Sequence, residues 1–171
     1  MPLAHVDGTT LEKVAVLGHS CGGCIALQYA LRYPRRLSHL ILVGTTAAWD
    51  GTHQVLAELE RRNPGAAVVT ALLDVAGDEA EFARGQKLVA ATLGFQLMAD
   101  CDVVSRLGEI DVPTLVLTGR HDFFRPPSQA ERMHRGIRGA DMIVFERSGH
   151  YPFIEEAEAF RAAVRKWISV G

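Results

Sequence analysis

The sequence lacks the features that mark several classes of protein. Its 171 residues include 18 Lys and Arg against 20 Asp and Glu, a net charge of −2, so no basic excess is available to bind nucleic acid. No apolar run approaches the roughly 20 residues that a membrane-spanning helix needs, and no basic segment followed by an apolar one opens the chain. We therefore expect a soluble cytoplasmic protein with no nucleic-acid partner and no membrane partner.

Cysteine is also scarce, because only Cys21, Cys24 and Cys101 occur. An odd and sparse set does not make a disulfide framework, so we expect reduced thiols. Cys21 and Cys24 have the C-x-x-C spacing of redox motifs and of half a zinc site. No second cysteine pair completes such a site. We therefore expect no metal and no other cofactor.

The first third of the chain has the pattern of a strand, a sharp turn, a helix and a second strand. An apolar run over 14–17 ends at Gly18, and apolar residues at helical spacing over 25–33 stop at Pro34. A β-type run over 37–43 then closes at Gly44. This order predicts two parallel strands joined by a crossover helix, in a sheet that is buried on both faces.

The rest of the chain changes pattern twice. Residues 50–107 are predicted to be helices without strands, inserted between residues 1–49 and residues 108–171, which belong to one domain. Strand character returns over 113–119 and 142–145, with a helix between them that bears Ala130, Met133 and Ile137. A last helix is predicted over 155–170, and its apolar stripe for packing on the sheet consists of Phe160, Val164, Trp167 and Ile168.

The segment Gly18-His19-Ser20-Cys21-Gly22 matches G-x-S-x-G between a predicted strand and a predicted helix, which is the context of a nucleophile elbow. Small residues two before and two after the serine are expected to let the strand and the helix approach closely. The backbone N–H of Cys21, at the helix start, can stabilise an oxyanion. Glycine-flanked serines also occur in ordinary turns and in phosphate-binding loops, so the motif alone leaves both readings open.

Two further residues follow Ser20 in the order nucleophile, acid, histidine. Asp122 and His150 each follow a predicted strand, and the loops after parallel strands open at one edge of a sheet. His150 would take the serine proton, and Asp122 would fix its tautomer and stabilise the imidazolium. Asp50 is the alternative acid, but Asp122 follows the strand expected beside the histidine strand.

Seven histidines occur, and most histidines in proteins have no catalytic role. They are His5, His19, His39, His53, His121, His134 and His150. Only His150 follows the last strand in a loop with a flanking glycine. His19 and His121 adjoin the predicted nucleophile and acid, so they could line the pocket, although residues in such positions on strained loops usually point elsewhere.

Three stretches, over 14–23, 112–122 and 148–153, resemble the α/β-hydrolase superfamily. Their residue sequences resemble its proline iminopeptidase-like branch in particular. The resemblance implies an α/β fold class: a partial α/β-hydrolase fold with a mostly parallel sheet of about four strands flanked by helices. It also implies that residues 50–107 form a helical lid.

The chain departs from that family upstream of the serine. In the family, several strands and a loop that donates a second oxyanion N–H precede the elbow, whereas about a dozen residues precede it here. We read residues 1–10 as the tail of a helix, and we expect the strand before Ser20 to be an exposed edge. We therefore expect a truncated reading frame, a fragment, or a homo-oligomer that covers this edge. Loss of one oxyanion N–H donor typically lowers turnover ~10²–10³-fold, so we expect a triad that is present but weak.

Three functions fit these residues. The first is a serine hydrolase that cleaves an ester, an amide or a short peptide through an acyl-enzyme, including a proline iminopeptidase-like aminopeptidase. Acidic residues of the insert could hold a substrate amine, although they are also typical of solvated helix faces: Glu58, Glu60, Asp74, Asp78, Glu79 and Glu81. The second is an inactive or weakly active fragment that serves as a binding or oligomerising module. The third keeps the elbow but cleaves carbon–carbon bonds or transfers acyl groups.

Overall fold

A four-stranded parallel sheet is the central layer of the part of the chain that the computed structural model describes, residues 5–6, 9–10, 12–48 and 102–170. The strands run in the order β3-β4-β5-β6. Their bounds are Val14–His19 for β3, Leu37–Val43 for β4, Thr114–Gly119 for β5 and Asp141–Phe145 for β6. The predicted α/β fold with a parallel sheet of about four strands is therefore confirmed.

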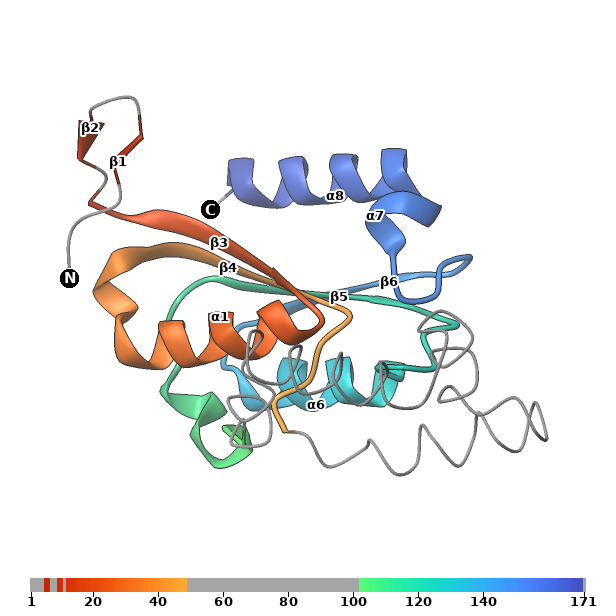
Figure 1. The fold of residues 1–171 in the computed structure, drawn as a ribbon, viewed down its shortest axis with the longest axis horizontal. Helices are drawn as coiled ribbons and strands as arrows, with labels where there is room; N and C mark the ends of the chain where they lie inside the picture. The colour runs from red at the N-terminus through yellow and green to blue at the C-terminus, as the bar shows by residue number, and fades with distance from the viewer. Residues whose placement is uncertain (1–4, 7–8, 11, 49–101, 171) are drawn as a thin grey trace, which may run out of the picture. The chain divides into compact units, whose positions relative to one another are not determined.

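Helices cover both faces of this sheet (Figure 1). Helices α1 (Cys21–Arg32) and α6 (Pro127–Gly136) pack on one face, where Leu27 and Met133 are fully buried. Helix α8 (Ala157–Val170) covers the other face, where Phe160 packs with Phe145. Apolar residues on both sides of β4 and β5 explain the continuous apolar runs of these two strands.

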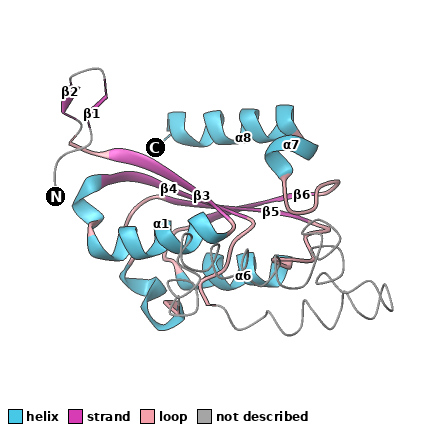
Figure 2. Cartoon of the chain, viewed as in Figure 1, coloured by secondary structure: helices cyan, strands magenta, loops and turns pink. Residues whose placement is uncertain are grey.

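Short segments complete the described elements, which Figure 2 distinguishes by type. Helix α7 (Pro152–Glu155) precedes α8, and there are two 3-10 helices in the described ranges, η1 (Pro34–Arg36) and η2 (Val104–Glu109). None of the helices within the described ranges has the length and apolarity needed to cross a bilayer. The predicted helical insert spans residues 50–107, and most of it lies outside the described residues, which exclude 49–101. The boundaries of the insert and its role as a lid therefore stay predictions.

The register of the sheet brings the carboxyl ends of all four strands to one edge. His19 pairs with Val43, Val43 with Leu117, and Gly119 with Phe145. The loops that begin after these residues carry Ser20, Asp122 and His150. The sheet thus places the three candidate residues at the same edge, as parallel strands require.

One prediction about local structure is wrong. Residues His5–Val6 (β1) and Thr9–Thr10 (β2) form an antiparallel pair, where the tail of a helix was expected. The two residues between them in the sequence are Asp-Gly, a pair that favours hairpin turns. The predicted last helix is present as α8, which begins two residues later than expected, after Glu156 adopts a non-helical backbone conformation.

The apolar stripe of α8 is narrower than predicted. Phe160 is buried, and Val164 and Trp167 pack beside it. Ile168 is instead 38% exposed. Trp167 also donates its indole N–H to Asp141 at 2.7 Å, which ties the helix to the start of β6.

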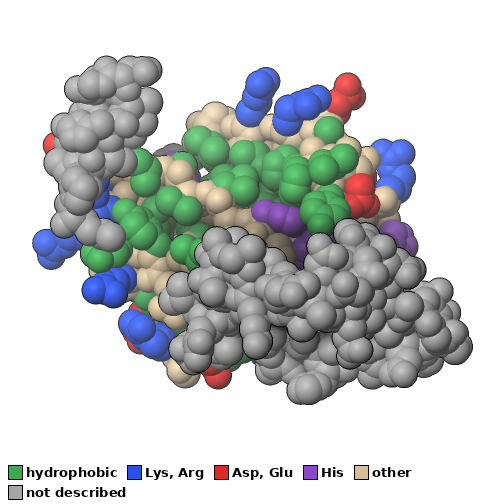
Figure 3. All heavy atoms as spheres, viewed as in Figure 1, with side chains coloured by type: hydrophobic (Ala, Val, Ile, Leu, Met, Phe, Trp, Pro, Cys, Tyr) green, Lys and Arg blue, Asp and Glu red, His purple; other side chains and the backbone are tan. Residues whose placement is uncertain are grey.

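Strand β3 lies at the edge of the described sheet, with β4 on its one paired side. Leu17 of β3 is 48% exposed, and Ile25 of the adjoining α1 is 60% exposed. In the space-filling view, hydrophobic side chains gather on the face that contains β3 and α1 (Figure 3). An edge strand with apolar neighbours is a surface on which another strand can add.

Candidate active site

Ser20 occupies a strained turn between β3 and α1. Its backbone angles are φ 53° and ψ −121°, and it is the one non-glycine residue with positive φ among those the structure describes. Such a conformation is costly for a residue with a Cβ and must be held by its surroundings. The backbone geometry is that expected of a nucleophile elbow.

Two glycines allow β3 and α1 to approach closely at this turn. They are Gly18 and Gly23, whereas the motif suggests Gly18 and Gly22. A Cβ on Gly18 would lie 2.5 Å from the carbonyl oxygen of Gly22. A Cβ on Gly22 would meet nothing within 4 Å, whereas a Cβ on Gly23 would overlap the Thr45 side chain. The expectation that small residues at 18 and 22 permit the close approach is therefore correct for Gly18 and wrong for Gly22, whose role belongs to Gly23.

Hydrogen bonds from neighbouring segments hold the turn. The Ser20 N–H donates to the Val43 carbonyl at 3.0 Å, and the Ser20 carbonyl accepts from the Gly23 N–H at 3.0 Å. The same carbonyl accepts from the Thr45 hydroxyl at 2.6 Å. Sequence reasoning missed Thr45. The available signal was its position just past a strand end, which it shares with Ser20 and Asp122.

Asp122 and His150 form a hydrogen-bonded pair. His150 Nδ1 lies 2.8 Å from Asp122 Oδ2, and the Asp122 residue is only 3% exposed. The other carboxylate oxygen accepts the Arg125 backbone N–H at 2.8 Å. With both oxygens engaged, the carboxylate is held in one orientation, which fixes the tautomer of His150 with its proton on Nδ1.

Gly44 makes room for this pair. Its φ is +48°, and a Cβ there would lie 3.2 Å from Asp122 Oδ2 and 3.3 Å from His150 Nδ1. Both the conformation and the space therefore favour glycine. Asp50, the alternative acid, lies outside the described residues.

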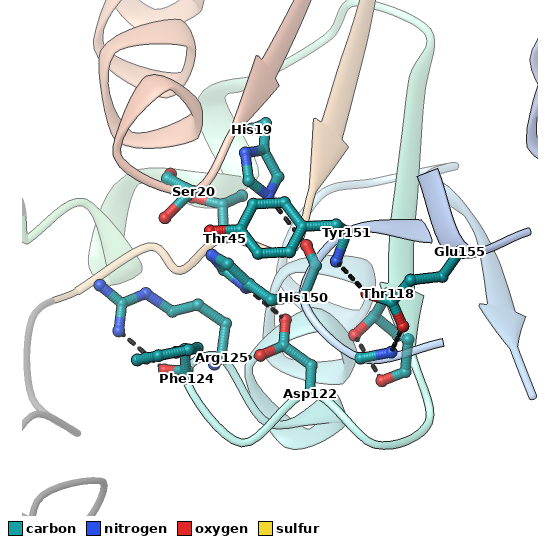
Figure 4. Close-up of polar contacts among 12 residues, drawn as sticks. His19, Ser20, Thr45, Thr118, Asp122, Phe124, Arg125, His150, Tyr151 and Glu155 are labelled. Carbon is teal, nitrogen blue, oxygen red and sulfur yellow. Dashed lines mark hydrogen bonds and ion pairs between the residues drawn. The ribbon is translucent and has the colours of Figure 1, made fainter. Parts of the chain in front are cut away.

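Figure 4 shows the His150 ring between Ser20 and Asp122. Ser20 Oγ contacts Cys21 Sγ at 4.0 Å, and within the described residues it makes no hydrogen bond to His150. Hydrogen bonds between catalytic groups are often long in unliganded enzymes and tighten when substrate binds. The structure thus brings Asp122 and His150 into contact and places Ser20 at the same sheet edge.

Two carboxylates brace the loop that carries His150. Glu155 accepts the backbone N–H groups of Gly149 and Tyr151. Glu156 accepts the Ser148 hydroxyl at 2.7 Å and the Arg147 N–H at 2.9 Å. The hydrogen bond from Ser148 is the main reason why the pKa of Glu156 lies below its ordinary value. Both glutamates were missed, because nothing in their local sequence indicates contact with the preceding loop.

The two described cysteines occupy different environments. Cys21 is the first residue of α1, where a backbone N–H has no partner within the helix. Cys24 is buried and its thiol donates to the Thr46 carbonyl at 3.3 Å. Within the part of the chain that the structure describes, no cluster of three or more His, Cys, Asp or Glu side chains could hold a metal ion.

His19 turns towards the site, contrary to expectation. Its Nε2 lies 2.9 Å from the His150 carbonyl oxygen, and the two ring centroids are 4.7 Å apart. Burial lowers the pKa of His19 below its ordinary value of 6.5, opposed by the hydrogen bond to His150. His121, the other histidine beside a candidate residue, is exposed.

The fold and this site define a class of protein. The family model described as the alpha/beta hydrolase family matches residues 3–163. The chain therefore belongs to the alpha/beta hydrolase family. The proline iminopeptidase-like branch is not shown by the comparisons and stays a prediction.

Individual relatives are hydrolases by name. The pimeloyl-[acyl-carrier protein] methyl ester esterase of Neisseria meningitidis is 30% identical, over 98% of this chain and 75% of the relative. The 2-hydroxy-6-oxononadienedioate/2-hydroxy-6-oxononatrienedioate hydrolase of Cupriavidus pinatubonensis is 31% identical, over 93% of this chain and 63% of the relative.

Solved structures share the fold. A thermophilic esterase superimposes with a TM-score of 0.65 at 27% identity, over 92% of this chain and 66% of that one. A hydrolase from Pseudomonas aeruginosa gives a TM-score of 0.67 at 23% identity and covers 92% of this chain. The chain spans 65% of the Pseudomonas structure, and at that identity the likeness shows the fold alone.

Proposed function

We propose that this chain is a serine hydrolase that cleaves carboxylic esters through an acyl-enzyme on Ser20. One observation carries the proposal: a buried Asp122 carboxylate orients His150 at 2.8 Å, at the sheet edge where Ser20 occupies a strained elbow. Nucleophile, base and orienting acid in this chain order are the parts of a serine-hydrolase triad.

The chemistry follows from these positions. Ser20 Oγ attacks the ester carbonyl carbon while His150 Nε2 takes the serine proton. The backbone N–H of Cys21 donates to the oxyanion, assisted by the N-terminus of α1. His150 then returns the proton to the leaving alcohol. Water attacks the acyl-enzyme by the same route in reverse, which releases the acid and regenerates Ser20.

Two observations favour esters with an apolar portion. The similar proteins include a methyl ester esterase, and aromatic side chains flank His150. Phe124 and Tyr151 have ring centroids 5.3 Å and 5.1 Å from the His150 ring and are both partly exposed. Amide cleavage of the proline iminopeptidase type stays the alternative, and the acidic residues considered for binding an amine lie outside the described residues.

The decisive experiment is labelling of the purified 171-residue chain with a fluorophosphonate probe. Wild type is expected to label, and the Ser20→Ala and His150→Ala variants are expected not to. The same samples are then assayed with p-nitrophenyl butyrate and with proline p-nitroanilide. Ester turnover without anilide turnover supports the esterase, and the reverse supports the aminopeptidase. A folded wild type that does not label would contradict the proposal and favour a binding or oligomerising role.

A further inference from the structure

His19 connects two segments that lie 131 residues apart in the sequence. It is the last residue of β3, directly before Ser20, and its ring reaches the loop after β6 (Figure 4). The 2.9 Å contact is to the main-chain carbonyl oxygen of His150. Because a carbonyl can only accept, the His19 Nε2 must carry the proton, which leaves Nδ1 unprotonated in the neutral ring.

Aromatic rings fix the orientation of His19. The Tyr151 centroid is 5.3 Å away, and the Phe153 ring meets His19 edge-on at 4.9 Å and 81°. The His150 ring itself is 4.7 Å away with a 50° tilt. A side chain packed in this way makes its hydrogen bond from a restricted set of rotamers, so the bond constrains the His150 backbone.

The surroundings also favour an uncharged His19. Burial lowers the pKa of His19 most, and the neighbouring His150 lowers it further, whereas the bond to the His150 carbonyl and the charge of Asp122 raise it. Among the described residues, the titratable groups that face His19 are His150, Asp122 and Tyr151. A neutral ring adds no positive charge beside His150 when His150 takes up the serine proton.

We propose that His19 is a positioning residue: its Nε2–H holds the His150 carbonyl, and this keeps the imidazole between Ser20 and Asp122. The inference rests on the proposed hydrolase function. It differs from a packing role because it assigns the effect to one donated hydrogen bond. A side chain that keeps the donor without the ring should therefore preserve turnover, and a ring without a donor should not.

The test compares three variants of the full chain in hydrolysis of p-nitrophenyl butyrate. His19→Gln keeps an N–H donor, His19→Phe keeps an aromatic ring, and His134→Gln replaces an exposed histidine of α6 as the control. We expect His19→Phe to lower kcat about ten- to a hundredfold with KM changed less than about twofold, since misplacement of a catalytic group acts on turnover. We expect His19→Gln to stay within about threefold of wild type.

Several results would overturn the inference. If His19→Phe behaves like His134→Gln, the hydrogen bond has no positioning role. If His19→Gln loses as much as His19→Phe, the ring and not the donor matters. A wild type that neither labels with the fluorophosphonate nor hydrolyses the ester overturns the proposed function as well, whereas an active wild type beside an unaffected His19→Phe overturns this inference alone.

A spectroscopic measurement on the wild type covers the case in which His19→Phe does not fold. The ¹⁵N chemical shifts of the His19 ring should show a protonated Nε2 and an unprotonated Nδ1 at neutral pH. The opposite tautomer excludes the hydrogen bond to His150. The pH profiles of kcat/KM for wild type and His19→Gln should also superimpose above neutrality, and a shifted limb there would mean that His19 is charged in the working enzyme.

Discussion

At the scale of single residues, Gly22 and Gly23 form a natural pair for comparison. Both lie in the first turn of α1, yet a Cβ on Gly23 would overlap the Thr45 side chain, whereas a Cβ on Gly22 would enter open space. Thr45 donates to the Ser20 carbonyl at 2.6 Å. A side chain at position 23 that displaces Thr45 would therefore also disturb the hydrogen bond that holds the Ser20 turn.

We predict opposite effects of alanine at these positions. Gly23→Ala should lower the free energy of unfolding by about 1–3 kcal/mol, because overpacking forces neighbouring atoms to shift. Gly22→Ala should be neutral or stabilise by up to about 1 kcal/mol, because alanine is the better helix former. Urea unfolding of both variants beside wild type measures the difference. Equal effects of the two substitutions would show that Thr45 yields without cost.

At the scale of elements, the loop between β6 and α7 depends on two consecutive glutamates. Glu155 binds the N–H groups on either side of His150, and Glu156 binds Arg147 and Ser148. The break in the helix at Glu156 gives its carboxylate this position.

The pKa of Glu156 makes this brace dependent on pH. Its folded pKa is lowered, chiefly by the hydrogen bond from Ser148. The stabilisation is thus fully present above the unfolded glutamate pKa, about 4.3, and is lost as the pH falls through the folded pKa. Glu156→Gln should have a lower Tm than wild type at pH 7, and the difference should shrink towards pH 3.

The matched control for this prediction is Glu158→Gln, a neighbouring glutamate that is exposed on α8. Thermal unfolding of wild type and both variants between pH 3 and pH 7 separates the loop brace from the general effect of removing a negative charge. A Tm difference for Glu156→Gln that does not change with pH would contradict a role for the carboxylate charge.

The elements that sequence could predict are those governed by local pattern. Apolar runs that reach Gly18, Gly44 and Gly119 located the strand ends to within one residue, and the strand ends placed the loops of Ser20, Asp122 and His150 at one edge. The supports of that site come from tertiary contacts. His19, Thr45 and Glu156 act on residues that adjoin them only after folding, so neither spacing nor periodicity could reveal their partners.

At the scale of the whole molecule, the open edge of β3 is the feature with the clearest consequence in solution. Leu17 and Ile25 are 48% and 60% exposed beside a strand that is paired on one side within the described sheet. Burial of apolar surface contributes about 25 cal/mol per Å², and a free edge offers backbone hydrogen bonds to a second strand. Both terms favour association of two copies through this edge.

We therefore predict that the chain self-associates and that Leu17→Lys shifts it towards the monomer, because a charge at the pairing edge must be desolvated or exposed on association. Sedimentation velocity over a range of concentrations measures the shift. Ile154→Lys is the control, since Ile154 is 67% exposed but lies in α7. If Leu17→Lys and Ile154→Lys sediment alike, the β3 edge does not drive association. A wild type that stays monomeric and labels at Ser20 would contradict the predicted self-association. It would show that the site forms in a single copy whose β3 edge is not paired with a second copy.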